Sequence, residues 1–173
     1  HAQVLAPAVG TLLCIEGSQG ANVKNITFSN ISFQHSAYVM PKWGNEPEQA
    51  AASNPATVHL DFAENINFVN CQVMHTGNYG FWFRKACESC SVKHSLLSDL
   101  GSGGVKIGDI YVPDDSTLVT RRVLIENNII QRTGMVLPCG VGIAIFHSSY
   151  NKLLHNEISN LRYSGVSVGW IWG

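Results

Sequence analysis

The stretch Ile66-Asn67-Phe68-Val69-Asn70-Cys71-Gln72-Val73-Met74-His75-Thr76-Gly77 decides the fold, because its pattern recurs along the chain. Two apolar residues two positions apart are followed by a polar residue and, three positions later, by another apolar residue. Alternation with a period of two indicates short strands, and its repetition indicates a solenoid. The pattern occurs five times, as Ile26/Phe28/Asn30/Phe33, Ile66/Phe68/Asn70/Val73, Cys90/Val92/His94/Leu97, Val123/Ile125/Asn127/Ile130 and, with a polar first member, Asn151/Leu153/His155/Ile158.

The polar members of the repeats lie 40, 24, 33 and 28 residues apart, and we interpret 24 residues as a bare coil and the longer steps as coils with loops. A second strand follows a corner in each coil. The sequence therefore predicts an all-β parallel β-helix of five to six coils, with residues 1–173 as a single unit and the polar members stacked in one inward column. The predicted second strands are 13–16, 58–61, 81–84, 105–108, 143–146 and 166–169.

The last strand ends at Trp170-Ile171-Trp172-Gly173 with no polar capping coil after it. Solenoids need atypical terminal repeats, because an open apolar edge invites aggregation. We expect the chain to be an internal piece of a longer β-helix protein, whose remaining coils, or a partner chain, cover the open ends.

The composition narrows the classes of ligand. The 173 residues are 45% hydrophobic and 13% charged, with a net charge of -1, which does not favour nucleic acid. No apolar run reaches the ~20 residues of a membrane span. The five cysteines include one CxxC, Cys87-Glu88-Ser89-Cys90, but a lone CxxC is weak support for zinc. We expect core packing or a local disulfide there, and neither a metal nor another cofactor.

The strand that contains Val58 and Leu60 predicts a ligand groove. If these two residues point inward, polar and aromatic side chains converge on the outer face, and the loops 38–55 and 110–118 flank it. The alternative is an exposed face whose charges only pair with one another, as Asp61 with Arg84. The outer columns are Cys14/His59/Trp82/Lys106/Ala144/Ser167, Glu16/Asp61/Arg84/Gly108/Phe146/Gly169 and, past the strand end, Phe62/Lys85/Asp109/His147/Trp170.

The corner before this strand forms a further column of His35, His75, Asp99, Arg132 and Asn160. His75 and Asp99 lie one coil, or about 4.8 Å, apart. At that spacing a carboxylate can orient an imidazole and raise its pKa. The alternative is that corners are exposed and polar without a function.

Three segments of the chain resemble segments of large secreted right-handed parallel β-helix proteins. They are 75–80, which reads His-Thr-Gly-Asn-Tyr-Gly, 99–109, which contains Gly-Gly-Val-Lys-Ile-Gly-Asp, and 156–170, which contains Ser-Gly-Val-Ser-Val-Gly-Trp. Within these proteins the chain is most similar to the glycoside hydrolase family 141-like group. The resemblance implies an extracellular or periplasmic enzyme that hydrolyses plant cell-wall polysaccharides with two carboxylates. The implied substrate contacts are His59, His75, Trp82, Arg84, Lys85, Lys106, Tyr111, His147, Trp43 and Trp170.

The candidate carboxylates are Asp61, Asp99 and Asp109. Asp109 suits a base or nucleophile, because Lys85 and His147 are its neighbours in the predicted stack and favour its ionised form. Either Asp61 or Asp99 would then be the acid, and the stereochemical outcome stays open.

Two other functions fit the same fold. A polysaccharide lyase would use a Lys or Arg base and often Ca²⁺ held by clustered carboxylates, for which Asp114-Asp115 is the only adjacent pair. A glycan-binding solenoid without catalysis would carry aromatic residues but no converging acids. Unsaturated products would indicate the lyase, and acid substitutions without effect would indicate the binding protein.

Overall fold

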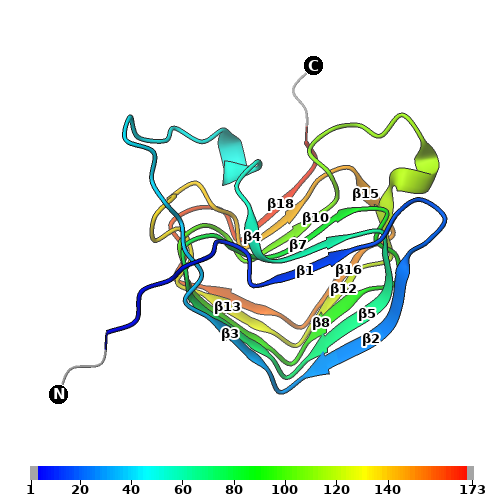
Figure 1. The fold of residues 1–173 in the computed structure, drawn as a ribbon, viewed down its shortest axis with the longest axis horizontal. Coiled ribbons are helices and arrows are strands. Elements are labelled where there is room, and N and C mark those ends of the chain that lie inside the picture. The colour runs from blue at the N-terminus through cyan, green and yellow to red at the C-terminus, as the bar shows by residue number, and fades with distance from the viewer. Residues whose placement is uncertain (1–3, 171–173) are drawn as a thin grey trace.

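The computed structural model describes residues 4–170, which form stacked coils of a right-handed parallel β-helix (Figure 1). Strands from successive coils pair in parallel and build three sheets. The first sheet contains β1 (Leu13–Glu16), β4 (Ala56–Asp61), β7 (Tyr79–Lys85), β10 (Val105–Ile107), β14 (Ile143–Ile145) and β18 (Val166–Val168).

The second and third sheets meet at an edge opposite the first sheet (Figure 1). The second sheet contains β2 (Val23–Ser29), β5 (Ala63–Val69), β8 (Ser91–Lys93), β12 (Leu124–Glu126) and β16 (Lys152–Leu154). The third sheet contains β3 (Ser32–Gln34), β6 (Gln72–Thr76), β9 (Leu96–Leu100), β13 (Ile129–Gln131) and β17 (Glu157–Ser159). A short pair, β11 (Thr120–Arg121) and β15 (Ser148–Ser149), and two 3₁₀ helices, η1 (Gln49–Ala51) and η2 (Ser116–Leu118), complete the described elements.

Alternate side chains of the three sheets point into one apolar core. Phe68 stacks on Phe28 with ring centroids 5.0 Å apart and meets Phe81 of the first sheet edge-on at 4.9 Å. Val58 and Leu60 are fully buried, as the alternation predicts. Cys90 occupies the same inward column as Ile66 and Val123.

The polar members of the repeats occupy one column, but the prediction that this column points inward is wrong. Asn30, Asn70, His94, Asn127 and His155 all have left-handed backbones, with φ of 59°, 52°, 50°, 53° and 51°, and all are exposed. A left-handed residue turns the chain at the corner and interrupts the alternation of faces. The inward polar column lies one position later, where Ser95 N donates to Asn128 Oδ1 (2.9 Å) and Asn128 N to Asn156 Oδ1 (3.1 Å).

The five cysteines are free, and the alternative of a local disulfide is therefore wrong. Cys87 and Cys90 lie in the core, where their thiols contact the carbonyl oxygens of Leu60 (3.3 Å) and Ala63 (3.6 Å). Burial raises the pKa of Cys90 to about 11, so both cysteines act as small core residues. Within residues 4–170, no helix has the length and apolar character needed to cross a membrane.

Two loops rise above the outer face of the first sheet, as predicted (Figure 1). Loop 38–55 carries η1 and folds down onto the sheet, where the Tyr79 hydroxyl donates to Ala50 O (2.5 Å). Loop 109–119 carries η2 at the other end of the strands and is fixed by a bond from Ala86 N to Leu118 O (2.8 Å). These loops decide which outward side chains of the first sheet meet solvent.

Candidate functional site

The first outward column has the predicted register. His59 pairs with Cys14 on one side and with Trp82 on the other, and Trp82 pairs with Lys106. The second column departs from its prediction, because the register shifts between Leu60 and Asp61, and Asp61 pairs with Lys85 instead of Arg84. Such an irregularity re-aims side chains at a strand end.

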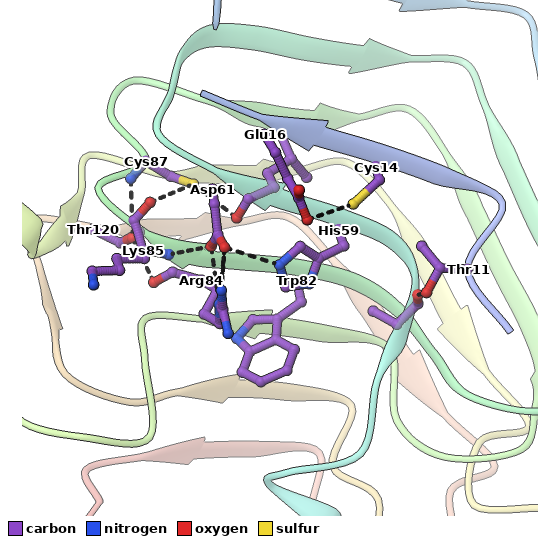
Figure 2. Close-up of polar contacts among 12 residues, drawn as sticks. Thr11, Cys14, Glu16, His59, Asp61, Trp82, Arg84, Lys85, Cys87 and Thr120 are labelled. Carbon is purple, nitrogen blue, oxygen red and sulfur yellow. Dashed lines mark hydrogen bonds and ion pairs between the residues drawn. The ribbon is translucent and has the colours of Figure 1, made fainter. Parts of the chain in front are cut away.

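Asp61 is the centre of a polar cluster at the end of β4 (Figure 2). Arg84 Nε donates to Asp61 Oδ1 (3.0 Å), and the Nη2 of Arg84 contacts Asp61 Oδ2. The backbone N–H of Lys85 donates to Asp61 Oδ1 (3.1 Å), and His59 Nε2 lies 3.3 Å from Asp61 Oδ2. The Asp61–Arg84 ion pair, which is expected if the charges of this face only pair with one another, is therefore present. Arg84 reaches Asp61 in spite of the register shift.

The environment keeps Asp61 ionised. Its side chain is 8% exposed, and burial by itself raises the pKa of a carboxyl. The hydrogen bonds from His59 and Arg84 outweigh this effect, so the pKa of Asp61 is lowered. The pKa of Arg84 is raised, chiefly by its bond to Asp61 and further by the charges of Asp109 and Glu16. Among residues 4–170, the Arg84 guanidinium therefore bonds to Asp61 alone, with its side chain 37% exposed, and the charges of Asp109 and Glu16 act on it from a greater distance.

Asp109 stands at the end of β10 with far fewer partners. Its Oδ1 accepts one hydrogen bond, from the N–H of Tyr111 (3.3 Å). The preceding Gly108 has φ of +94°, and Trp82 Nε1 donates to Gly108 O (3.0 Å). A Cβ at Gly108 would lie 2.8 Å from the carbonyl oxygen of His147, so the close approach of the neighbouring coil requires a glycine here.

Loop 38–55 covers two of the predicted ligand contacts. Lys106 is fully buried, and its Nζ donates to Ala52 O (2.7 Å) and Asn54 O (2.5 Å). The same Nζ lies 3.3 Å from the centre of the buried Trp82 ring. Lys106 and Trp82, predicted as glycan contacts, are therefore buried in this structure, with loop 38–55 packed over them.

Asp99 and His75 belong to a separate cluster at the corner of the third sheet. Asp99 Oδ2 lies 2.7 Å from His75 Nδ1, and Arg132 Nη2 lies 3.3 Å from Asp99 Oδ1. The bond from His75, followed by the contact with Arg132, lowers the pKa of Asp99. This cluster precedes the first-sheet strands and the Asp61 cluster follows them, so about 20 Å of a strand such as β7 (Tyr79–Lys85) separates the two.

The remaining predicted contacts lie around the rim of the outer face. Trp43 and Tyr111 are 89% and 73% exposed on the two loops. Trp170 packs edge-on against Phe146 (5.2 Å) and lines a hollow of about 300 Å³ beside loop 38–55. Lys85 extends over the Phe62 ring (5.9 Å), and the backbone N–H of His147 donates to Asp109 O (3.3 Å).

Glu16 also belongs to this site, although it lies outside the predicted set of candidate carboxylates and appears only in a predicted outward column. It pairs in register with Asp61 and is exposed, and its Oε1 accepts from the Cys14 thiol (3.0 Å) (Figure 2). The sequence pattern could have identified Glu16, because it holds the same position in its predicted strand as Asp61 holds in the next. The open edge, formed by the C-terminal ends of the first-sheet strands, therefore carries Glu16, Asp61 and Asp109 as well as Arg84.

Comparison with known proteins shows the family of this chain. The family model described as "Periplasmic copper-binding protein (NosD)" matches residues 2–169. The chain belongs to the NosD family. A solved structure titled "Glycoside hydrolase" is similar to it, with a TM-score of 0.91 and 24% identity over 95% of this chain. That likeness shows the fold alone, and the chain spans 34% of the length of that protein. No curated protein matches.

Copper is implied by the description of the NosD family, and the side chains of residues 4–170 do not fit it. Copper sites use convergent imidazole and sulfur ligands. His35 and His75 stack with ring centroids 5.5 Å apart at an interplanar angle of 14°, so their in-plane lone pairs run nearly parallel and cannot converge. Within residues 4–170, no three His, Cys, Asp or Glu side chains gather closely enough to hold a metal ion.

Proposed function

We propose that this NosD-family β-helix is the glycan-facing part of a secreted or periplasmic glycoside hydrolase acting on cell-wall type polysaccharide. The observation that carries this proposal is the group of carboxylates at the ends of the first-sheet strands: Asp61 is bonded to Arg84, Glu16 pairs in register with Asp61, and Asp109 follows β10. Exposed Trp43 and Tyr111 on the flanking loops offer flat faces for sugar rings. The resemblance of three segments to family 141-like enzymes supports the substrate class.

Asp109 is the proposed reactive carboxylate, because one hydrogen bond from Tyr111 N leaves its second oxygen free. Asp61 has no such freedom, since both of its oxygens accept from Arg84, and it acts as the positioning residue for that guanidinium. Asp61 and Asp109 lie two coils, or about 9.6 Å, apart at their backbones. This spacing resembles that of an inverting pair, but Asp61 is held by Arg84 and is not assigned as the second reacting carboxylate.

The acid role that the sequence analysis gave to Asp61 or Asp99 is not retained. A general acid needs a raised pKa, and the pKa of each of these carboxyls is lowered. The lack of a tuned acid among them favours glycan binding without catalysis as the second candidate function. The lyase is the least favoured, because Asp61 raises the pKa of Arg84 and loop 38–55 covers Lys106, which leaves neither as an accessible base.

The substitution Asp109→Asn in the full-length protein tests the proposal. We expect turnover on cell-wall polysaccharides, measured as released reducing ends, to fall at least ~100-fold, as the loss of an acid/base group causes. The melting temperature should change little, because the side chain makes a single hydrogen bond. Asp114→Asn is the matched control, since Asp114 is an exposed residue of the same loop.

The outcomes separate the two candidate functions. Near-normal turnover of Asp109→Asn contradicts the role of Asp109. If the wild-type protein binds polysaccharide but releases no sugar, the hydrolase is contradicted and glycan binding is supported. In that case Arg84→Gln should weaken binding at least ~10-fold, because a charged hydrogen-bond donor is lost.

A further inference from the structure

A cavity of about 270 Å³ lies just past the C-terminal ends of β4 and β7, where the first sheet turns into the second. Its floor includes Phe62 and Ala86, which follow those strands. The turn of the first coil supplies Gln19 and Asn22, and η2 and the residue after it supply one further side. Neither Asp61 nor Asp109 lines this cavity, so it is separate from the proposed glycan-facing edge.

A contact between distant coils closes one side of the cavity. Gln19 Nε2 of the first coil donates to Asp115 Oδ2 of the fourth-coil loop (3.2 Å), across the two coils that form the floor. Asp115 is itself fixed, because its Oδ1 accepts from Thr117 N (2.8 Å). The first-coil turn and loop 109–119 approach each other at the right of Figure 1. The cavity is therefore built by long-range contacts and does not depend on a ligand for its shape.

The cavity has a cation with unused hydrogen-bond donors. The Nε of Arg121 lies 3.6 Å from Glu88 Oε2, too far for a hydrogen bond, while Glu88 Oε1 accepts from Arg122 Nη1 (2.5 Å). Within residues 4–170, the Arg121 guanidinium donates to no acceptor, although it is only 34% exposed. Lys24 also lines the cavity, with its Nζ paired to Glu64 Oε2 (2.7 Å), so the ionisable residues of the lining are Lys24, Arg121 and Glu88.

We propose that this cavity binds one hexuronate unit, a sugar ring that carries a carboxylate. The guanidinium of Arg121, which is ion-paired with Glu88 at 3.6 Å but donates no hydrogen bond to the described residues, matches a carboxylate, which accepts two parallel hydrogen bonds from arginine. Phe62 offers an apolar surface for the C–H face of the sugar ring. The side-chain amides of Gln19 and Asn22 can form hydrogen bonds with the hydroxyl groups of the sugar. The volume is close to the ~300 Å³ at which small-molecule sites begin, which suits one ring.

Titration of the intact protein with three probes tests this site without reference to catalysis. The probes are glucuronate, glucose as the ring without the carboxylate, and acetate as the carboxylate without the ring, with affinity measured by calorimetry or NMR. We expect glucuronate to bind at least ~10-fold more tightly than either of the others, because only it uses both the guanidinium and the ring surface.

Variants then locate the binding. Arg121→Gln should weaken glucuronate binding at least ~10-fold, and Gln19→Ala a few-fold, because the contact with Asp115 is lost. Arg132→Gln is the matched control on the distant third sheet and should bind as the wild type does. Absence of glucuronate binding, equal binding of acetate, or unchanged affinity of Arg121→Gln would overturn the proposal. Turnover of Asp109→Asn bears on the proposed hydrolase alone and leaves this result unaffected.

Discussion

The outer face of the first sheet has a covered part and an open part, built from neighbouring positions of the same strands. In the covered part, Tyr79, Trp82 and Lys106 are buried beneath loop 38–55. In the open part, Arg84 and Glu16 reach solvent beside Asp61. The difference shows that a column of outward side chains in a β-helix is only a potential ligand surface. The loops decide which part of it a polysaccharide can reach.

The two parts also use their cations differently. Arg84 is bound by a carboxylate, which raises its pKa. Burial lowers the pKa of the Lys106 amine, and its hydrogen bonds go to two loop carbonyls. Arg84 can therefore present charge to a ligand, whereas Lys106 fastens loop 38–55 to the sheet.

The largest expected effect comes from Lys106→Met. The substitution keeps an apolar stem over Trp82 but leaves Ala52 O and Asn54 O without their donor, and each buried, unsatisfied carbonyl costs about 1–3 kcal/mol. We expect the free energy of unfolding to fall by about 3 kcal/mol. Chemical denaturation measures it, and proteolysis should cut loop 38–55 faster.

Lys85→Met is the matched control for the open part. Lys85 is a partly exposed residue of the adjacent coil, and its Nζ lies over the face of Phe62, its one side-chain partner among residues 4–170. Its loss should change the free energy of unfolding by less than ~0.5 kcal/mol, as is usual at a surface. Equal losses in the two variants would contradict the distinction between a covered and an open part.

The sequence predicts which outward side chains share a column more reliably than it predicts which of them reach solvent. The period of two places His59, Trp82 and Lys106 in one outward column, and the structure confirms that register. Periodicity cannot reveal that loop 38–55 folds down on them, because that depends on contacts such as Lys106 with Ala52, 54 positions apart.

Irregular backbone accounts for the other differences. The register shift after Leu60 pairs Asp61 with Lys85, and an even strand pattern does not predict it. The left-handed corner residues, such as Asn70, turn outward and leave the inward polar column to Asn128 and its equivalents. Asparagine tolerates the left-handed region, so the residue type was compatible with the corner although the direction was not foreseen.

A smaller effect is expected from Asp61→Asn in the open part. The asparagine can keep one acceptor for Lys85 N and Arg84, but the ion pair is lost and Arg84 is partly solvated. We expect a loss of about 1–2 kcal/mol at pH 7. Calorimetric unfolding measures it, and no loss would mean that water replaces the carboxylate without cost.

The pH dependence sharpens the same comparison. Because the folded pKa of Asp61 is lowered, its ionisation stabilises the fold above the unfolded pKa of ~3.9, and this stabilisation is lost as pH falls through the folded value. The wild type should therefore lose stability more steeply than Asp61→Asn between about pH 4 and pH 2. Parallel curves would contradict a lowered pKa for Asp61.

An effect smaller than that of Asp61→Asn is expected at the distant corner, from Asp99→Asn. Asp99 also has a lowered pKa and two cationic or potentially cationic neighbours, but His75 and Arg132 are about half exposed, so water and salt screen the cluster. We expect a loss below ~1 kcal/mol at low salt that shrinks further at 1 M NaCl, whereas the loss for Asp61→Asn should persist because Asp61 is buried. Polysaccharide turnover should stay unchanged, because a strand length separates Asp99 from the open edge. A turnover loss comparable to that of Asp109→Asn would show that the corner contacts substrate and would return Asp99 to the catalytic candidates.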